Sequence, residues 1–201
     1  MIPVYRQVFN AAFTPDKYRE MLTDIEQQLP GQLDFRVAET PVFVPAELRG
    51  KLIAAGENII DVIAQPDFKA RTEAAIPPSQ RVPNEDERPE FLTFDFAVCR
   101  NSQGDLEPQL IELQGFPSLY AFQVWLPAVF RQHYPIAGGV SPFLTVPDAD
   151  AYHAQMRKLI VGDADSENVI LLELFPRQQK TRIDFVLSEK AWGITTVNLI
   201  D

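Results

Sequence analysis

Two stretches of this sequence decide the fold: residues 92–99, LTFDFAVC, and residues 109–115, QLIELQG. In each of them apolar and polar side chains alternate, which is typical of a β-strand with one buried face. Between them, residues 101–105 read NSQGD, a run of turn-forming residues. The two stretches therefore predict an antiparallel β-hairpin whose turn is centred on Gln103 and Gly104.

The predicted register brings acidic side chains together on one face of the hairpin. With the turn so centred, Ser102 pairs with Asp105, and Asp95 pairs with Glu112. Because side chains alternate across a strand, Gln114 shares the face of Asp95 and Glu112, and four apolar residues face the core. Those four are Phe94, Phe96, Ile111 and Leu113. Two carboxylates directly opposite each other repel, unless a proton, a bridging cation or solvent relieves the repulsion.

A divalent cation is the functional interpretation of this acidic pair. Proteins bind Mg²⁺ through one or two carboxylates together with substrate phosphates, so Asp95, Glu112 and Gln114 are candidate metal ligands. The structural alternative is a solvent-exposed hairpin that carries acidic residues without a ligand, and a one-residue slip in register would separate the pair. Pro108 indicates that the second strand is an edge strand or begins irregularly.

The hairpin and the turn after it resemble the glutathionylspermidine synthase-like, circularly permuted ATP-grasp family. The resemblance rests on Phe94-Asp95-Phe96-Ala97, Leu110-Ile111-Glu112-Leu113-Gln114 and Pro117-Ser118-Leu119, and it is clearest over residues 91–125. It implies that Asp95 and Glu112 bind Mg²⁺, that Gln114 takes the place of the family's Asn, and that Ser118 belongs to the phosphate-binding turn. The sequence departs from the family at Gln114, at Thr93, where the family often has a basic residue, and in its longer hairpin.

The resemblance implies an ATP-dependent carboxylate–amine ligase, which uses Mg²⁺ and ATP to activate a small-molecule carboxylate as an acyl phosphate and transfers it to an amine. In this family the lysines that hold ATP come well after the acidic residues. The chain would therefore be the N-terminal part of such a ligase, or a natural remnant of one, and inactive in ligation by itself. The alternative is a non-catalytic ligand-binding or interaction domain that has lost the nucleotide site, which Gln114 and Thr93 would fit.

Three basic residues lie close together between a predicted strand and a predicted helix: Arg177, Lys180 and Arg182. Loops at the carboxyl ends of parallel strands are where α/β sheets bind ligands, and a helix N-terminus adds backbone donors. The three residues are therefore candidates to bind a substrate carboxylate or phosphate, with Arg able to do so bidentately. The alternative is that they pair with surface acids, since the chain has 28 Asp and Glu against 18 Lys and Arg.

Composition excludes several classes of partner. The net charge of −10 disfavours nucleic acids and anionic membranes as partners, because a protein binds both through a basic surface. No apolar run approaches the roughly 18 residues of a membrane span, and the N-terminus does not read as a signal peptide. The single cysteine, Cys99, excludes an internal disulfide. We therefore expect a cytoplasmic globular protein, with a homodimer as one open option.

The whole pattern predicts an α/β or α+β fold, with N-terminal helices followed by an antiparallel hairpin and a βαβ unit in a mixed sheet. The resemblance implies that this fold is pre-ATP-grasp or ATP-grasp-like. A Pro-rich linker at 77–90 would separate a helical section, 1–76, from a mixed-sheet section, 91–201, unless the chain is one continuous domain. The predicted helices cover 14–30, 45–62, 66–75, 118–134, 147–161 and 181–192. The further strands cover 169–174, an almost continuous apolar run typical of a buried strand, and 195–200, and residues 35–44 form a short strand or an extended segment.

Overall fold

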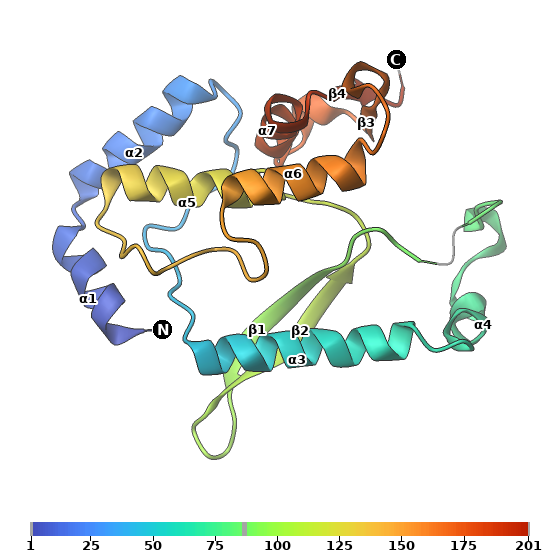
Figure 1. The fold of residues 1–201 in the computed structure, drawn as a ribbon, viewed down its shortest axis with the longest axis horizontal. Helices are drawn as coiled ribbons and strands as arrows, with labels where there is room; N and C mark the ends of the chain where they lie inside the picture. Colours follow the sequence, from blue (N-terminus) through green and yellow to red (C-terminus); the bar gives the residue numbers. More distant parts are fainter. Residues whose placement is uncertain (1, 86–87, 201) are drawn as a thin grey trace. The chain divides into compact units, whose positions relative to one another are not determined.

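The computed structural model describes residues 2–85 and 88–200. Within them it has seven α-helices and two β-sheets of two strands each, which confirms a mixed α/β fold (Figure 1). The expectation of one mixed sheet is wrong, because the hairpin and the βαβ unit form separate sheets. None of the described helices is both long enough and apolar enough to cross a membrane.

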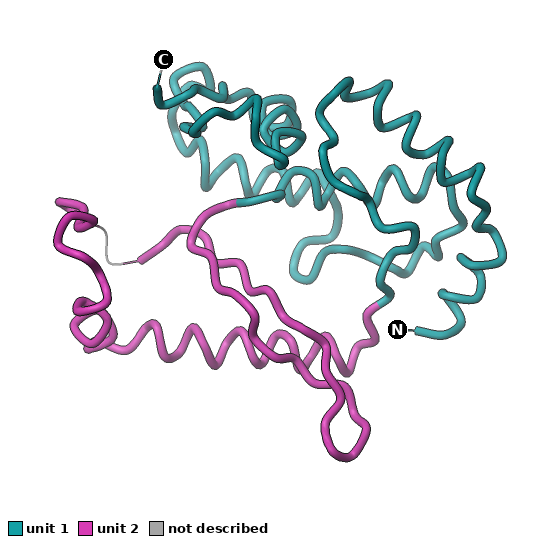
Figure 2. Tube along the Cα trace, turned by 180° about the vertical axis from the view of Figure 1, so that it is seen from behind, with its two compact units in different colours: residues 1–43, 118–201 teal, residues 44–117 magenta. Residues whose placement is uncertain are grey.

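The chain divides into two compact units, residues 1–43 with 118–201, and residues 44–117 (Figure 2). The sequence instead places a division at 77–90, and this segment lies inside the second unit, where Pro78–Gln80 form a short 3-10 helix. Residues 86 and 87 of the predicted linker lie outside the described residues, as do the two chain ends. The two compact units describe how the chain packs. The division into a section 1–76 and a section 91–201 concerns domains, and it stays a prediction.

The first unit begins with two helices, α1 (Pro3–Ala12) and α2 (Pro15–Gln28). Helix α2 starts as predicted, since the Thr14 hydroxyl accepts a hydrogen bond from the Lys17 backbone N–H at 3.1 Å. The rings of Phe13 and Tyr18 lie 6.3 Å apart and pack across this start as a hydrophobic staple. Helix α1 is missing from the sequence-based prediction.

An aromatic cluster forms the core where α1 meets α5 (Phe122–His133) in the first unit. Phe9 of α1 is fully buried, with its ring centroid 4.6 Å from that of Tyr134 and 6.2 Å from that of Phe130. Phe43 is buried beside it, at a centroid distance of 6.4 Å. Offset and tilted ring pairs of this kind contribute beyond the area that they bury. This cluster therefore ties the start of the chain to the segment after residue 117.

Of the two options predicted for 35–44, a short strand or an extended segment, the strand is wrong, because these residues form no regular structure. Their apolar side chains serve as separate anchors in the first unit, with Val37 and Phe43 both 4% exposed. The carbonyl of Val37 accepts a hydrogen bond from the Tyr18 hydroxyl, and that of Phe43 accepts one from the Ile2 backbone N–H. Backbone groups of this segment are thus satisfied one at a time rather than by a neighbouring strand.

The C-terminal part of the first unit is a βαβ unit, as predicted. Helix α6 (Ala149–Ile160) leads to β3 (Ile170–Glu173), α7 (Arg182–Trp192) and β4 (Thr195–Asn198), and the two strands are parallel. Gly193 ends α7 in the left-handed region, with φ of 71°. The almost continuous apolar run at 169–174 is typical of a buried strand, but this expectation is wrong for β3, since Ile170 is 53% exposed and Leu172 50% exposed.

The second unit packs a hairpin against one long helix. Helix α3 (Ala46–Ile63) follows Pro45, and α4 (Phe68–Thr72) with a 3-10 turn at Glu73–Ala75 matches the predicted short helix. The hairpin consists of β1 (Thr93–Arg100) and β2 (Leu106–Gln114). The Phe94 ring packs over Gly56 of α3, where a Cβ would lie 3.8 Å from the ring, an ordinary van der Waals distance. The helix therefore covers one face of the hairpin.

Candidate functional site

The hairpin places Asp95 directly opposite Glu112, as the sequence predicts. Thr93 lies opposite Gln114, so the acidic pair and Gln114 share the hairpin face opposite to Phe94. Both carboxylates are exposed, and the Gln114 side-chain amide donates a hydrogen bond to Glu112 Oε1 at 2.9 Å. The three predicted ligands are therefore brought together.

The turn of this hairpin differs from the predicted one. The Asn101 backbone N–H donates to the Asp105 carbonyl, and the Asn101 side chain accepts from the backbone N–H groups of Gln103 and Asp105. Ser102 therefore does not pair with Asp105, and the turn is centred on Gln103. Gly104 adopts φ of 88°, which favours glycine.

A β-bulge restores the acidic pair despite the shifted turn. From the turn as far as Phe96, the paired residues are one position out of the predicted register. The register then changes between Phe96 and Asp95. Ile111 is the extra residue, because Phe96 faces Leu110 and Asp95 faces Glu112. Ile111 is 68% exposed, so its predicted place in the core is wrong, and Leu113 at 39% exposed is only partly covered. Bulges re-aim side chains and are frequent beside functional sites.

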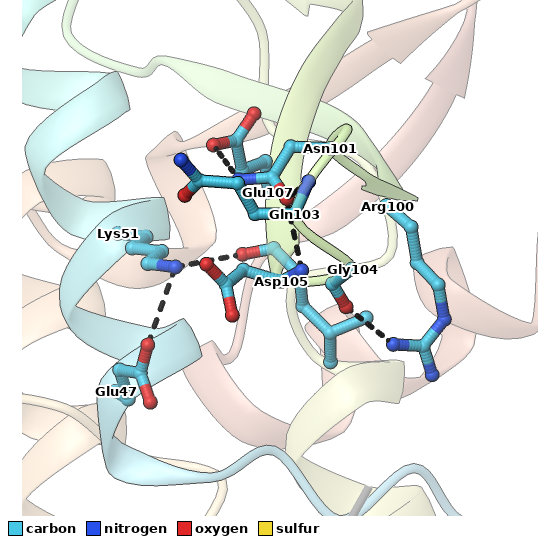
Figure 3. A network of polar contacts seen from close by, with 9 residues as sticks. Glu47, Lys51, Arg100, Asn101, Gln103, Gly104, Asp105 and Glu107 are labelled. Carbon is cyan, nitrogen blue, oxygen red and sulfur yellow. Dashed lines mark hydrogen bonds and ion pairs between the residues drawn. The ribbon is translucent and has the colours of Figure 1, made fainter.

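The end of the hairpin is held onto α3 by the contacts drawn in Figure 3. The Lys51 ammonium of α3 donates to the Leu106 carbonyl at 3.0 Å and pairs with Glu47 at 3.2 Å. Arg100 donates to the Gly104 carbonyl at 2.7 Å and thereby closes the turn. With these contacts the β-ribbon that carries Asp95 and Glu112 is fixed to a helix rather than free to slip in register.

The donor set of the pair fits a hard divalent cation. Cβ atoms of directly opposite residues lie about 5 Å apart, so a cation between the two carboxylates can touch an oxygen of each. Within residues 2–85 and 88–200, no three His, Cys, Asp or Glu side chains are placed so that they could hold one metal ion together. Asp95 and Glu112 would therefore supply two ligands, and water or phosphate oxygens the rest, which is how Mg²⁺ is usually held.

Arg182 of the predicted basic loop is engaged inside the first unit. Its guanidinium pairs with Asp34 at 2.8 Å and donates to the carbonyls of Gly31 at 3.0 Å and Gln179 at 3.1 Å. The Arg182 hydrogen bond and charge lower the pKa of the Asp34 carboxyl from its ordinary value. For Arg182 the structural alternative, pairing with a surface acid, is thus what the structure shows.

The other two basic residues of this loop lie exposed. Arg177 belongs to a short 3-10 helix at Pro176–Gln178, and Lys180 follows it. The Gln179 side chain fastens the loop to the end of β3 by donating to Glu173 Oε2 at 2.7 Å and to the Leu174 carbonyl at 2.9 Å. Arg177 and Lys180 therefore sit on a loop whose backbone is held, and they remain the candidates for binding an anion there.

The turn that contains Ser118 already has an internal anion. Asp184 of α7 is 6% exposed, and its Oδ1 accepts a hydrogen bond from the Phe122 backbone N–H at 2.8 Å. The backbone of residues 119–121 also stabilises the Asp184 carboxylate, while burial raises its pKa above the ordinary value. A carboxylate at a helix N-terminus satisfies the donors that a phosphate would use. Ser118, half-buried before α5, therefore lies next to an occupied anion site.

Sequence reasoning missed Asp184 because its partner is 62 positions away along the chain. The available signal was an acidic residue in the first turn of an otherwise apolar helix. That position is explained equally well by the dipole of α7 itself. Only the packing of α7 against α5 shows that the carboxylate serves the other helix.

No protein-family model, curated protein or solved structure matches this chain.

Proposed function

We propose that the hairpin face formed by Asp95, Glu112 and Gln114 binds Mg²⁺ together with the phosphates of ATP. The observation that carries the proposal is the bulge-adjusted register, which sets two exposed carboxylates directly opposite each other beside an amide. A divalent cation between the two carboxylates would neutralise like charges that solvent only screens.

The wider proposal rests on the resemblance to the glutathionylspermidine synthase-like, circularly permuted ATP-grasp family. The chain would be the N-terminal part of an ATP-dependent carboxylate–amine ligase, with the ATP-grasp-like fold, small carboxylates and amines as substrates and a cytoplasmic location. When bound, Mg²⁺ would offset the phosphate charge and polarise the transferred group. Asp95 and Glu112 would hold the ion, Gln114 would orient Glu112, and Arg177 and Lys180 would bind an anionic substrate group.

A specific observation favours the second candidate, a non-catalytic ligand-binding or interaction domain. Three alternate apolar side chains are exposed along β3 and at the residue that follows it: Ile170 is 53% exposed, Leu172 50% and Leu174 50%. Parallel sheets are usually covered on both faces, so such a surface is typical of a site that a partner covers. In addition, the Arg182 guanidinium already donates hydrogen bonds to the Asp34 carboxylate and the Gly31 carbonyl, so fewer of its donors are left for a substrate anion.

Thermal denaturation with Mg²⁺ and ATP separates the two candidates. A ligand at 100 times its Kd stabilises by about 2.7 kcal/mol, which raises the Tm of a chain of this size by about 5–10 °C. We expect that rise in the wild type and its loss in Asp95→Asn and Glu112→Gln. Asp105→Asn, which removes the same charge near the turn of the same hairpin, should keep the rise. No rise at millimolar Mg²⁺ and ATP, or one that both variants retain, would exclude the proposed site.

A further inference from the structure

The first unit contains an apolar cavity, about half open to solvent, that neither the acidic hairpin nor the basic loop uses. Its volume is about 310 Å³, and its wall comes from α1, from the end of the 35–43 segment and from the chain after α5. The lining residues are Val4, Tyr5, Val8, Phe43, Pro135, Ile136 and Ala137. We propose that this cavity binds a small, uncharged, mainly hydrocarbon molecule.

The chemistry of the wall decides the class of ligand. All seven lining side chains are uncharged, in a protein with a net charge of −10, and only that of Tyr5 carries a hydrogen-bonding group. A charged ligand would lose its hydration here without gaining an opposite charge from the lining. An apolar ligand instead covers Val4 and Val8, which are 57% and 49% exposed.

The walls are held in place without a ligand. Phe43 is 4% exposed, its ring lies 5.8 Å from that of Tyr5, and its carbonyl accepts the Ile2 backbone N–H at 3.0 Å. On the opposite wall, the Arg131 guanidinium donates to the carbonyls of Ile136 at 3.3 Å and Ala137 at 3.4 Å, and to that of Val140. A preformed cavity binds without the cost of ordering its own walls.

The size of the site favours a small molecule over a protein partner. Seven residues line the cavity, whereas a stable protein interface uses about 20–30 residues on each side. The volume lies at the lower end of the range of about 300–1,000 Å³ that is usual for small-molecule sites. A compact ring system of one or two rings is therefore the expected size of ligand.

An NMR titration with indole, an uncharged two-ring probe, tests the proposal in the full chain. We expect indole to shift the methyl signals of Val4, Val8 and Ile136 saturably. Val8→Trp should fill the cavity and weaken indole binding at least tenfold, whereas Val62→Trp, at a comparably exposed valine on α3, should leave it unchanged. Val8→Asp, which adds a charge to the wall, provides a second variant if the Val8→Trp protein unfolds, and it should weaken binding similarly.

Three results would overturn the proposal. The first is the absence of saturable shifts at millimolar indole, and the second is equal binding by wild type and both position-8 variants. The third comes from sedimentation velocity: a wild-type dimer that Val8→Asp converts to monomer would assign the cavity wall to a second copy of the chain.

Discussion

Removing the Asp184 carboxylate should destabilise the protein through the start of α5. In Asp184→Ala, the Phe122 backbone N–H loses an acceptor at 2.8 Å in an environment where the Asp184 side chain was 6% exposed. A hydrogen bond to a charged group contributes about 1.5–3 kcal/mol, and a lost N-terminal cap costs about 0.5–2 kcal/mol. Removing the buried charge also removes its desolvation cost, which offsets part of these losses. We therefore expect the free energy of unfolding to fall by about 2–3 kcal/mol in Asp184→Ala, and Tm by about 5–10 °C.

Urea denaturation at pH 7 measures this loss, with Asp184→Asn as the matched control. The Asn side chain keeps one acceptor for the Phe122 N–H, so it should cost less than half as much as Ala. Added formate should partly restore the stability of Asp184→Ala, since the emptied site is an anion site. A loss below about 0.5 kcal/mol in Asp184→Ala would refute the reasoning, because the buried N–H groups would then have another acceptor.

The pH dependence of the same group has a definite sign. Burial raises the pKa of Asp184, so the folded protein holds the proton more tightly than the unfolded chain does. The stability that arises from this pKa shift is therefore complete below the ordinary pKa of about 3.9 and is lost as the pH rises through the raised value. The hydrogen bond from the Phe122 backbone N–H remains when the carboxylate is ionised, and it is the contribution measured at pH 7. Relative to Asp184→Asn, the wild type should be most favoured in acid. The opposite trend would contradict the burial of this carboxyl.

Three further predictions concern the first unit. Thr14→Ala should cost about 1 kcal/mol by urea denaturation because the cap of α2 is lost, whereas Thr14→Ser should be nearly neutral, and equal losses would deny the cap. Arg182→Gln should raise the lowered pKa of Asp34 toward its ordinary value in a ¹³C NMR titration, since the Arg182 hydrogen bond is its largest cause, and an unchanged pKa would show that another group lowers it. Burial lowers the pKa of His153, so stability should be complete above about pH 6.5 and fall as the pH drops through the lowered value. His153→Gln should lack that fall, and an identical profile in both proteins would assign it to other groups.

The sequence was sufficient to predict those elements whose conformation is determined by residues close by in the chain. Thr14 and Pro15 define the start of α2, and Gly193 defines the end of α7. The hairpin and the βαβ unit likewise follow from alternation and from turn residues close in sequence. These elements form largely as predicted because their determining contacts lie within a few positions along the chain.

Features that depend on distant contacts could not be predicted. The bulge at Ile111 has no local signature, and the predicted pairing of Asp95 with Glu112 is confirmed only because the bulge offsets the shifted turn. Arg182 meets Asp34 across 148 positions, and Asp184 meets Phe122 across 62. The apolar run of β3 also gives no information on what covers it, so its exposure becomes visible only in three dimensions.

The most direct test of the central claim is to locate a divalent cation on the hairpin. Mn²⁺, added to ¹⁵N-labelled protein at substoichiometric amounts, broadens the amide signals of the residues nearest to it. The proposed site predicts that Asp95 and Glu112 broaden first and that the double variant Asp95→Asn/Glu112→Gln loses this effect while Asp105→Asn keeps it. Broadening that is uniform, or strongest in another acidic run such as residues 163–167, would contradict the claim.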